Sequence, residues 1–289
     1  MSRRRSPVLA VVALLVVGCT PKQLVVRTTA LILPDEVAAM NAEPDLEVAR
    51  AAAAANLKLT EGLLRADPHN RGMAAATAQA FAGYSLAFVE VDDPPRAAEL
   101  YRRGKEIALA ALARDRRIAA ALGGSDDDFV AATERIGEGA KELLLWTAVC
   151  WGKWVDLSRT DPTAIADLPR VEALWRRLLK LDERYYYAAP HLFLGTFYGA
   201  RSPMLGGRPA EARHHFERAI ALTEGRFLFT RLYYAQYYAR QTLDRALFEE
   251  QLGLILEAPD DLLPEMRLAN TVAKRRAAEL LARVDEWFD

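Results

Sequence analysis

The sequence is poor in the residues that build disulfide frameworks and metal sites. It has two cysteines and four histidines in 289 residues, too few and too scattered for a disulfide scaffold or a zinc module. Its charges nearly cancel, with 38 Lys and Arg against 39 Asp and Glu, so no bulk positive field exists to hold a nucleic acid. The hydrophobic share of 52% is nevertheless large enough for a packed core.

Side chains arranged for catalysis are missing as well. His214 and His215 are neighbours that point in different directions, so they cannot share a metal as an i, i+4 pair would. The acidic run 126–128 lacks the spaced ligands of a calcium loop and suits the start of a helix. His191 is the one histidine in an aromatic setting, and a structural role is favoured over general-base work. We therefore expect no enzyme, no metal site and no cofactor.

The N-terminus has the pattern of an export signal. Three arginines at 3–5 precede an apolar run over 7–17, which is too short to cross a hydrocarbon core of roughly 30 Å. The run closes with the tetrad VVGC, which resembles a bacterial lipobox. We predict a signal peptide over 1–18 and a lipidated Cys19. The alternative is an ordinary signal peptide followed by a chance cysteine.

Lipidation would hold the mature chain outside the cytoplasm, through acyl chains that contribute about 0.8 kcal/mol per buried CH₂. We expect a lipid-anchored protein of the bacterial cell envelope that faces the periplasm. Thr20 follows the lipidated cysteine, where an aspartate would suggest the inner membrane, so the outer membrane is favoured. Cys150 is then left without a disulfide partner, and we interpret it as a small buried hydrophobe rather than a reactive thiol.

Beyond residue 45 the chain has helical character almost throughout. Alanine, leucine, arginine and glutamate dominate, and alternating β-branched runs are absent. Helix starts are indicated by Asp93-Pro94, by Asp161-Pro162, and by Ser125 with Asp128 as a capping box. We assign 19–45 to a lipidated tether that leads into an all-α domain over 46–289. Its predicted helices are 46–66, 71–90, 95–114, 126–136, 138–159, 168–181, 187–200, 209–223, 226–240, 244–257 and 262–287.

An internal repeat connects two parts of this domain. The segment 63–67 (LLRAD) returns at 178–182 (LLKLD), an offset of 115 residues. The same offset maps Ala97, Tyr101 and Gly104 onto Ala212, Phe216 and Ala219. An alanine, an aromatic and a small residue at this spacing are typical of the second helix in tetratricopeptide-like pairs. The predicted fold is therefore a compact superhelix of stacked antiparallel helix pairs, with a concave groove or pore between two related lobes.

Aromatic residues cluster instead of spreading evenly along the chain. Consecutive tyrosines such as those at 185–187 cannot all face one core in a helix, because neighbours diverge by about 100°. Some aromatic side chains should therefore line a groove, an interface or a passage, while the others pack helices together. The candidate ligand-binding residues are Tyr84, Trp146, Trp151, Trp154, Tyr187, His191, Phe193 and Tyr198.

Three segments carry a resemblance to a known family. They are 186–221, with its proline and glycine placements; 225–238, which contains YAQYY; and 268–281 near the C-terminus. Together with the VVGC tetrad they resemble the T-component (TatT) lipoproteins of TRAP transporter systems. This resemblance implies an all-helical, periplasm-facing lipoprotein that forms a homotrimer, has a hydrophobic passage in each protomer and docks a periplasmic solute-binding subunit. The implied ligand is hydrophobic or an organic acid.

Two functions remain open from the sequence. The first is an accessory lipoprotein of a TRAP-type uptake system, which binds or channels a small hydrophobic or organic-acid ligand together with a periplasmic solute-binding protein. The alternative is an envelope-assembly scaffold lipoprotein that grips protein partners and passes no small molecule. Both are lipid-anchored helical repeat proteins that bind no nucleic acid.

Overall fold

The computed structural model describes residues 21–288, and the predicted signal peptide and Cys19 lie outside this range. Every regular element among the described residues is a helix, so the predicted all-α fold is confirmed. The elements in chain order are α2 Pro21–Thr29, α3 Leu33–Ala42, α4 Leu46–Ala66, α5 Arg71–Phe88, α6 Pro94–Leu112, α7 Arg116–Leu122, α8 Asp126–Thr133, η1 Glu138–Ala140, α9 Lys141–Leu157, α10 Pro162–Ala166, α11 Leu168–Leu181, α12 Tyr185–Gly199, η2 Pro203–Leu205, α13 Pro209–Leu222, α14 Leu228–Tyr233, η3 Tyr234–Ala239, α15 Arg245–Glu257, η4 Pro264–Met266, α16 Arg267–Leu281 and α17 Asp285–Phe288.

Side-chain caps begin helices where the sequence predicts them. Asp93 accepts a hydrogen bond from the Arg96 backbone N–H at the start of α6. Ser125 and Asp128 form the predicted capping box at the start of α8, and Asp161 caps α10. Each cap satisfies a backbone N–H that the first helical turn leaves unpaired.

The helices also depart from the prediction in several places. Helices α7 and α10 were not predicted, because seven and five residues are too few to show a helical period. The predicted helix 226–240 is divided into α14 and the π-helix η3, and 262–287 into η4, α16 and α17. Residues 21–42, within the assigned tether, form α2 and α3. Their prolines stand at helix starts, where the missing N–H costs nothing.

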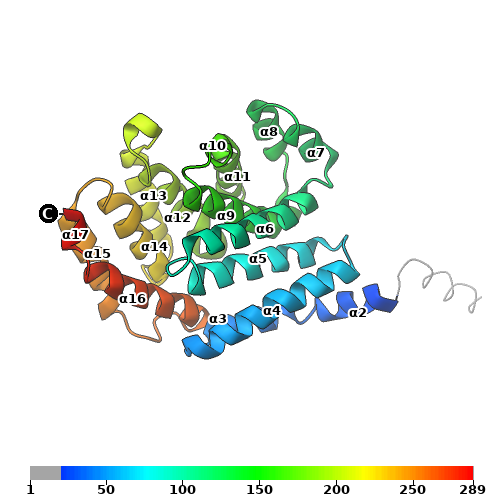
Figure 1. The fold of residues 1–289 in the computed structure, drawn as a ribbon, viewed down its shortest axis with the longest axis horizontal. Coiled ribbons are helices and arrows are strands. Elements are labelled where there is room, and N and C mark those ends of the chain that lie inside the picture. The colour runs from blue at the N-terminus through cyan, green and yellow to red at the C-terminus, as the bar shows by residue number, and fades with distance from the viewer. Residues whose placement is uncertain (1–20, 289) are drawn as a thin grey trace, which may run out of the picture.

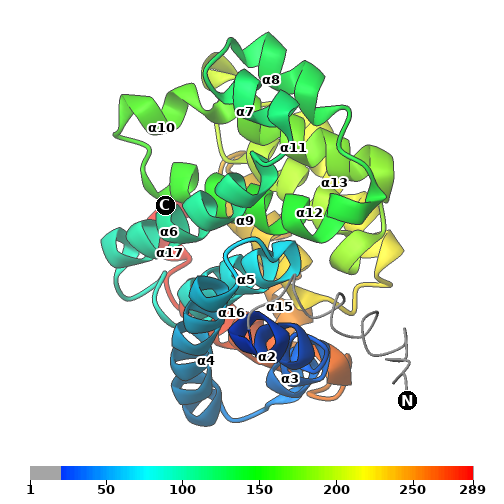
Figure 2. The ribbon, with the colours of Figure 1, turned by 90° about the vertical axis from the view of Figure 1, so that its right-hand side faces the viewer.

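The helices pack in chain order around a ring that closes on itself (Figures 1 and 2). Helix α4 packs on α5, α5 and α6 on α9, α9 on α11, α11 on α12 and α12 on α13. Helix α16 then returns from α14 to contact α3 and α4. Arg275 Nη2 donates to the Ala87 carbonyl at 3.1 Å across this closure. The ring therefore joins the two ends of the described chain and surrounds a common interior.

The residues of the internal repeat occupy corresponding places in this ring. Asp67 and Asp182 are the C-caps of α4 and α11. Tyr101 on α6 and Phe216 on α13 are both fully buried, and so are their neighbours Ala97, Gly104, Ala212 and Ala219. Helix α6 packs on α5 as α13 packs on α12. Their assignment to tetratricopeptide-like repeats stays a prediction.

Candidate functional site

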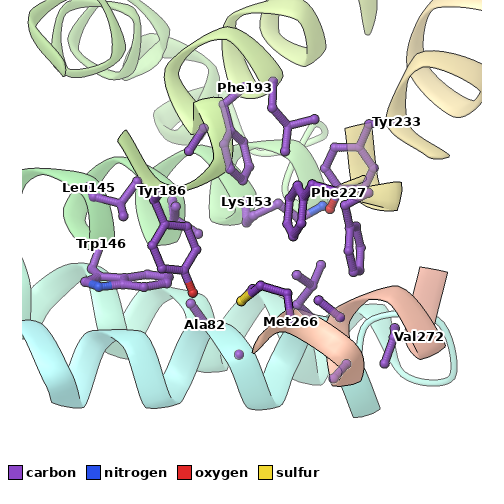
Figure 3. A pocket seen from close by; sticks show the side chains of 18 of the residues that line it. Ala82, Leu145, Trp146, Lys153, Tyr186, Phe193, Phe227, Tyr233, Met266 and Val272 are labelled. Atoms are coloured by element: carbon purple, nitrogen blue, oxygen red, sulfur yellow. The ribbon is translucent and has the colours of Figure 1, made fainter. Parts of the chain in front are cut away.

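An apolar cavity of about 140 Å³ lies inside the ring; we call it the central cavity (Figure 3). Its walls come from α3, α5, α6, α9, α12, α14, η4 and α16, so residues far apart in the sequence build it. The lining residues are Asn41, Ala82, Gly83, Leu86, Ala87, Tyr101, Leu145, Trp146, Val149, Lys153, Tyr186, Ala189, Leu192, Phe193, Phe227, Phe229, Tyr233, Met266, Leu268, Ala269 and Val272.

Helical periodicity decides which side chains of α9 reach this cavity. Trp146, Val149 and Lys153 are spaced by three and four residues, so they share one face of the helix, and all three line the cavity. Trp151 and Trp154 are on other faces. The indole N–H of Trp151 donates to Asp167 at 2.7 Å, and the two tryptophans pack in the wall between α9 and its neighbours. All three tryptophans are candidates from the sequence, and the structure shows that they lie on different faces of α9.

Three of the eight candidate residues line hollows inside the ring. Trp146 and Phe193 line the central cavity. Trp146 and Tyr84 line a second space of about 110 Å³ beside α3 and α4, which we call the N-terminal hollow. The Trp146 and Tyr186 rings meet edge to face at 5.1 Å and line both spaces. Together with Asn41, Gly83 and Leu268 they form the wall that the N-terminal hollow and the central cavity have in common.

The other candidates contact neighbouring helices instead of the central cavity. Lys105 Nζ lies 3.6 Å from the ring centroid of Trp154, and the Tyr198 hydroxyl donates to Glu172 at 2.7 Å. Tyr187 stacks on Phe227, a cavity-lining residue, with ring centroids 5.2 Å apart. Tyr187 therefore supports the cavity wall from behind.

His191 belongs to a separate polar cluster between α12 and α13. Its Nδ1 lies 2.9 Å from Nδ1 of His215, and its Nε2 lies 3.2 Å from Glu183. Burial lowers the pKa of both imidazoles, and that of His215 falls to about 4. Both rings are therefore neutral at neutral pH, and one Nδ1–H donates to the other nitrogen. This arrangement is a hydrogen-bonded contact between two helices.

A strained backbone segment begins α12. Tyr186, Tyr187 and Ala188 have φ of 47°, 57° and 57°, in the left-handed region that costs an L-residue about 1–2 kcal/mol each. Such strain persists where the surrounding structure imposes it, and it is concentrated at functional sites. The left-handed turn points the Tyr186 ring into the wall of the central cavity. The sequence had indicated only that the consecutive tyrosines must diverge.

One polar network interrupts the apolar interior; we call Glu90, Lys153, Asp156 and Arg276 the ion network. Lys153 Nζ donates to Glu90 at 3.0 Å and to Asp156 at 3.4 Å. Arg276 Nη1 donates to Glu90 at 3.4 Å, and the Tyr101 hydroxyl donates to the same carboxylate at 2.6 Å. Burial alone would raise the pKa of Glu90, but Lys153 and Arg276 outweigh it and lower that pKa. The carboxylate is therefore ionised.

Members of the ion network line the central cavity and two larger outer hollows. The lateral hollow, about 620 Å³, shares Lys153 and Phe193 with the central cavity. The C-terminal hollow, about 680 Å³, is lined by Glu90, Asp156 and Arg276. The two outer hollows share Asp156, Arg159, Ala200 and Gln241. The hollows thus form a series in which each one shares side chains with the next.

Sequence analysis missed the polar members of this site. Lys153 is 3% exposed. It follows residues 143–151 of the same helix, which are all apolar except for one threonine. A lysine in such a run is a signal for a buried ion pair, because an unpaired buried charge is very costly. Glu90, Arg276 and Tyr233 give no comparable local signal, since only the ring closure brings them together.

Cys150, a cysteine of the described residues, lies in a packed environment. Burial raises the pKa of the Cys150 thiol, and its Sγ lies 3.5 Å from the Ala78 carbonyl oxygen, which agrees with a packing role. Within residues 21–288, no group of three or more His, Cys, Asp or Glu side chains is arranged to hold a metal ion.

Comparison with protein families decides where this architecture belongs. The model of the TRAP transporter T-component family matches residues 42–288, which includes α4 to α17 and the whole ion network. The chain belongs to the TRAP transporter T-component family. Among curated proteins, no sequence matches it.

A TRAP transporter T-component is an accessory component of a TRAP transport system, and the family is not known for enzymatic activity. A transport component of this kind suggests a location in the cell envelope. In the part of the chain that the structure describes, each helix is too short or too polar to span a membrane.

Proposed function

We propose that this T-component protein is a lipid-anchored, periplasm-facing lipoprotein that binds a small hydrophobic or organic-acid ligand in its central cavity. It exchanges this ligand with a periplasmic solute-binding partner. The observation that carries the proposal is the apolar central cavity itself, built by helices from both ends of an accessory transport protein. Largely apolar walls with a few polar groups are typical of small-molecule sites.

The physical basis of binding is removal of apolar surface from water. Burying about 200 Å² of apolar ligand surface contributes roughly 5 kcal/mol before the costs of association. Such a site captures a solute without holding it irreversibly, as transfer requires. Trp146, Leu192 and Phe229 offer apolar contact on different sides of the cavity.

The series of hollows supports a route through the protomer. Trp146 and Tyr186 line both the N-terminal hollow and the central cavity, and Lys153 with Phe193 borders the lateral hollow. In this proposal these side chains are the constrictions of a passage. Phe193 stacks on Trp175 with centroids 4.6 Å apart, so opening toward the lateral hollow requires that stacked pair to separate.

The proposed assembly is a homotrimer anchored through Cys19. Met204 and Leu205 are 96% and 73% exposed in η2, and Leu205 also lines the lateral hollow. Exposed apolar side chains at the opening of a hollow favour contact with another protein. We assign this edge to the docking of the solute-binding partner.

The test is native mass spectrometry of the lipidated protein, captured from its own cells after mild crosslinking. We expect a trimer with a periplasmic solute-binding protein and additional mass from a ligand. The Ala269→Phe variant fills the central cavity from α16 and should lose the ligand mass. Ala278→Phe, on the exposed face of the same helix, is the matched control and should keep it.

A different outcome would favour the alternative function. A monomer crosslinked to envelope-assembly proteins, without a solute-binding subunit and with no ligand mass, would contradict transport. The scaffold function would then explain the helical surface better than ligand transfer does.

A further inference from the structure

Exposed apolar side chains gather in α2 and in the turn that follows it. Four of them lie within residues 24–32, and we call them the N-terminal patch: Leu24 (61% exposed), Val25 (60%), Leu31 (76%) and Ile32 (60%). No other stretch of nine residues in the described part of the chain holds more than two large apolar side chains that are exposed. Single exposed apolar residues are ordinary, but a group of them marks a contact surface.

Helix α2 turns one face toward the protein and the opposite face outward. It packs on α4, and Val26 is its one buried residue. At about 100° per residue, Leu24 lies roughly 160° around the helix from Val26, and Val25 about 100°. The hydroxyl of Thr28, which is also exposed, donates to the carbonyls of Leu24 and Val25, both at 2.9 Å. The outward face is therefore largely apolar, and the hydroxyl proton it carries is already bonded within the helix.

The N-terminal patch lies close to the predicted lipid anchor. Helix α2 forms an outer end of the molecule, away from α17 (Figures 1 and 2). Cys19 stands two residues before Pro21, the first residue of α2, and two residues of extended chain span about 7 Å at most. Acyl chains on Cys19 that are inserted in a bilayer would therefore hold the start of α2 at the bilayer surface.

The charge around the patch is positive, although the whole chain is nearly neutral. Residues 21–34 contain Lys22 and Arg27 and no acidic residue. Both side chains are exposed; the Nε of Arg27 lies 3.5 Å from Asp67 of the next turn of chain after α4, yet its side chain remains 59% exposed. An apolar helix face flanked by cations is typical of helices that lie on an anionic lipid surface.

This charge also argues against a second copy of the chain as the occupant. Two copies that met through the same patch would bring their Lys22 and Arg27 side chains together, and like charges repel. A bilayer instead offers acyl chains for the apolar side chains and phosphates for the cations. The observations on α2 therefore favour lipid over self-contact.

We propose that α2 and the turn after it form a membrane-contact element. The N-terminal patch enters the boundary between headgroups and acyl chains, while Lys22 and Arg27 face anionic lipid phosphates. This inference rests on the proposed lipid anchor at Cys19 and adds a second contact, which fixes the orientation of the ring. Helix α13, which follows η2, lies away from α2 in both views (Figures 1 and 2), so this orientation leaves the η2 edge clear of the membrane for the solute-binding partner.

The test is fluorescence quenching of the full lipidated protein in vesicles of phosphatidylethanolamine and phosphatidylglycerol. A thiol-reactive NBD label is placed at position 24 through Leu24→Cys, because Cys150 is fully buried and the Cys19 sulfur carries the lipid. Lipids with a nitroxide on the acyl chain should reduce the emission at least about twofold, since an interfacial helix buries its apolar face about 5–10 Å deep.

Leu243→Cys is the matched control. Leu243 is 72% exposed in the turn before α15, and its label should not be quenched. Adding Leu31→Gln and Ile32→Gln to Leu24→Cys should remove about half of the quenching or more, because interfacial binding scales with the apolar area inserted. Met204→Gln with Leu205→Gln removes equally exposed apolar side chains elsewhere and should leave the quenching unchanged.

Mass spectrometry of the same protein separates failure of this inference from failure of the anchor. An acylated protein whose labels at 24 and 243 are equally unquenched would overturn the membrane contact and leave the anchor standing. A label at 24 that is shifted to the blue but not quenched would show a second copy on the patch and would also overturn it. A chain without acyl mass that does not bind vesicles would overturn the lipoprotein proposal together with this inference.

Discussion

The helix pairs α5–α6 and α12–α13 share one packing pattern and differ in the chemistry placed on it. In each pair a glycine allows the two helices to approach closely. A Cβ at Gly104 of α6 would lie 3.1 Å from the Phe81 Cβ of α5, and one at Gly195 of α12 would lie 3.0 Å from the Phe216 ring of α13. Tyr101 and Phe216, which the 115-residue offset matches, are both fully buried. Close helix approach around an aromatic is thus common to both pairs.

The polar groups of the two pairs are not equivalent. The Tyr101 hydroxyl donates to Glu90 and joins the ion network, whereas Phe216 stacks on Tyr234 with centroids 5.1 Å apart. The α12–α13 pair instead carries His191 and His215 where the offset places Ala76 and Leu100 in α5–α6. The comparison teaches that packing residues maintain the architecture, while isolated polar replacements give each pair its own chemistry.

The largest expected effect is on packing in the second pair. Phe216→Ala should lower the free energy of unfolding by about 3–5 kcal/mol, because it empties a fully buried position between α12 and α13. Urea denaturation followed by circular dichroism measures this loss. His214→Ala, exposed on the same helix, should change stability by less than about 0.5 kcal/mol. A loss below 1 kcal/mol for Phe216→Ala would show that α13 is not packed as described.

A smaller effect should distinguish the two cavity tyrosines that differ in hydrogen bonding. Tyr101→Phe should cost about 1.5–3 kcal/mol, because it removes a hydrogen bond to a buried carboxylate. Tyr233→Phe should cost nothing or stabilise the fold, since its hydroxyl has no partner. The same denaturation measurement on both variants tests the contrast. Equal losses would mean that the Tyr233 hydroxyl is paired in solution.

Much of this fold could be predicted because its signals are local. The cap Asp93 and the capping box of Ser125 and Asp128 marked helix starts correctly. Short helices such as α7 escaped prediction, because seven residues show too little periodicity. Pro21 and Pro34 lie in the segment 19–45 that we assigned to a tether, but proline also suits the first turn of a helix, and both stand at helix starts.

The candidate site was harder to predict than the fold. Trp146 and Trp151 are equally plausible ligand-binding residues in the sequence. In the structure they lie on different faces of α9, so that Trp146 lines the central cavity and Trp151 donates to Asp167. The ion network joins Glu90 to Arg276 across 186 residues, a contact created by ring closure. A single sequence contains the residues of this network but not the distances between them. Some aromatic residues of the central cavity were therefore among the candidates from the sequence, whereas the charged residues of the ion network were not.

The smallest effect expected is a pH dependence confined to the second pair. The pKa of His215 falls from an ordinary 6.5 to about 4, chiefly through burial and then through His191 and His214. Between these values the unfolded chain binds more protons than the folded chain, so the free energy of unfolding decreases as pH falls. His215 is half-buried, and solvent screening reduces the effect to on the order of 1 kcal/mol.

Hydrogen exchange at pH 7.5 and pH 5 can locate this effect within the molecule. Protection factors, corrected for intrinsic exchange, should fall in α12 and α13 and stay constant in α5 and α6, where Ala76 and Leu100 occupy the matched positions. His215→Leu should remove most of the pH dependence, because it removes the imidazole whose pKa burial lowers. Uniform loss of protection in both pairs would instead point to acid sensitivity elsewhere in the ring, and the histidines would lose their place in the comparison.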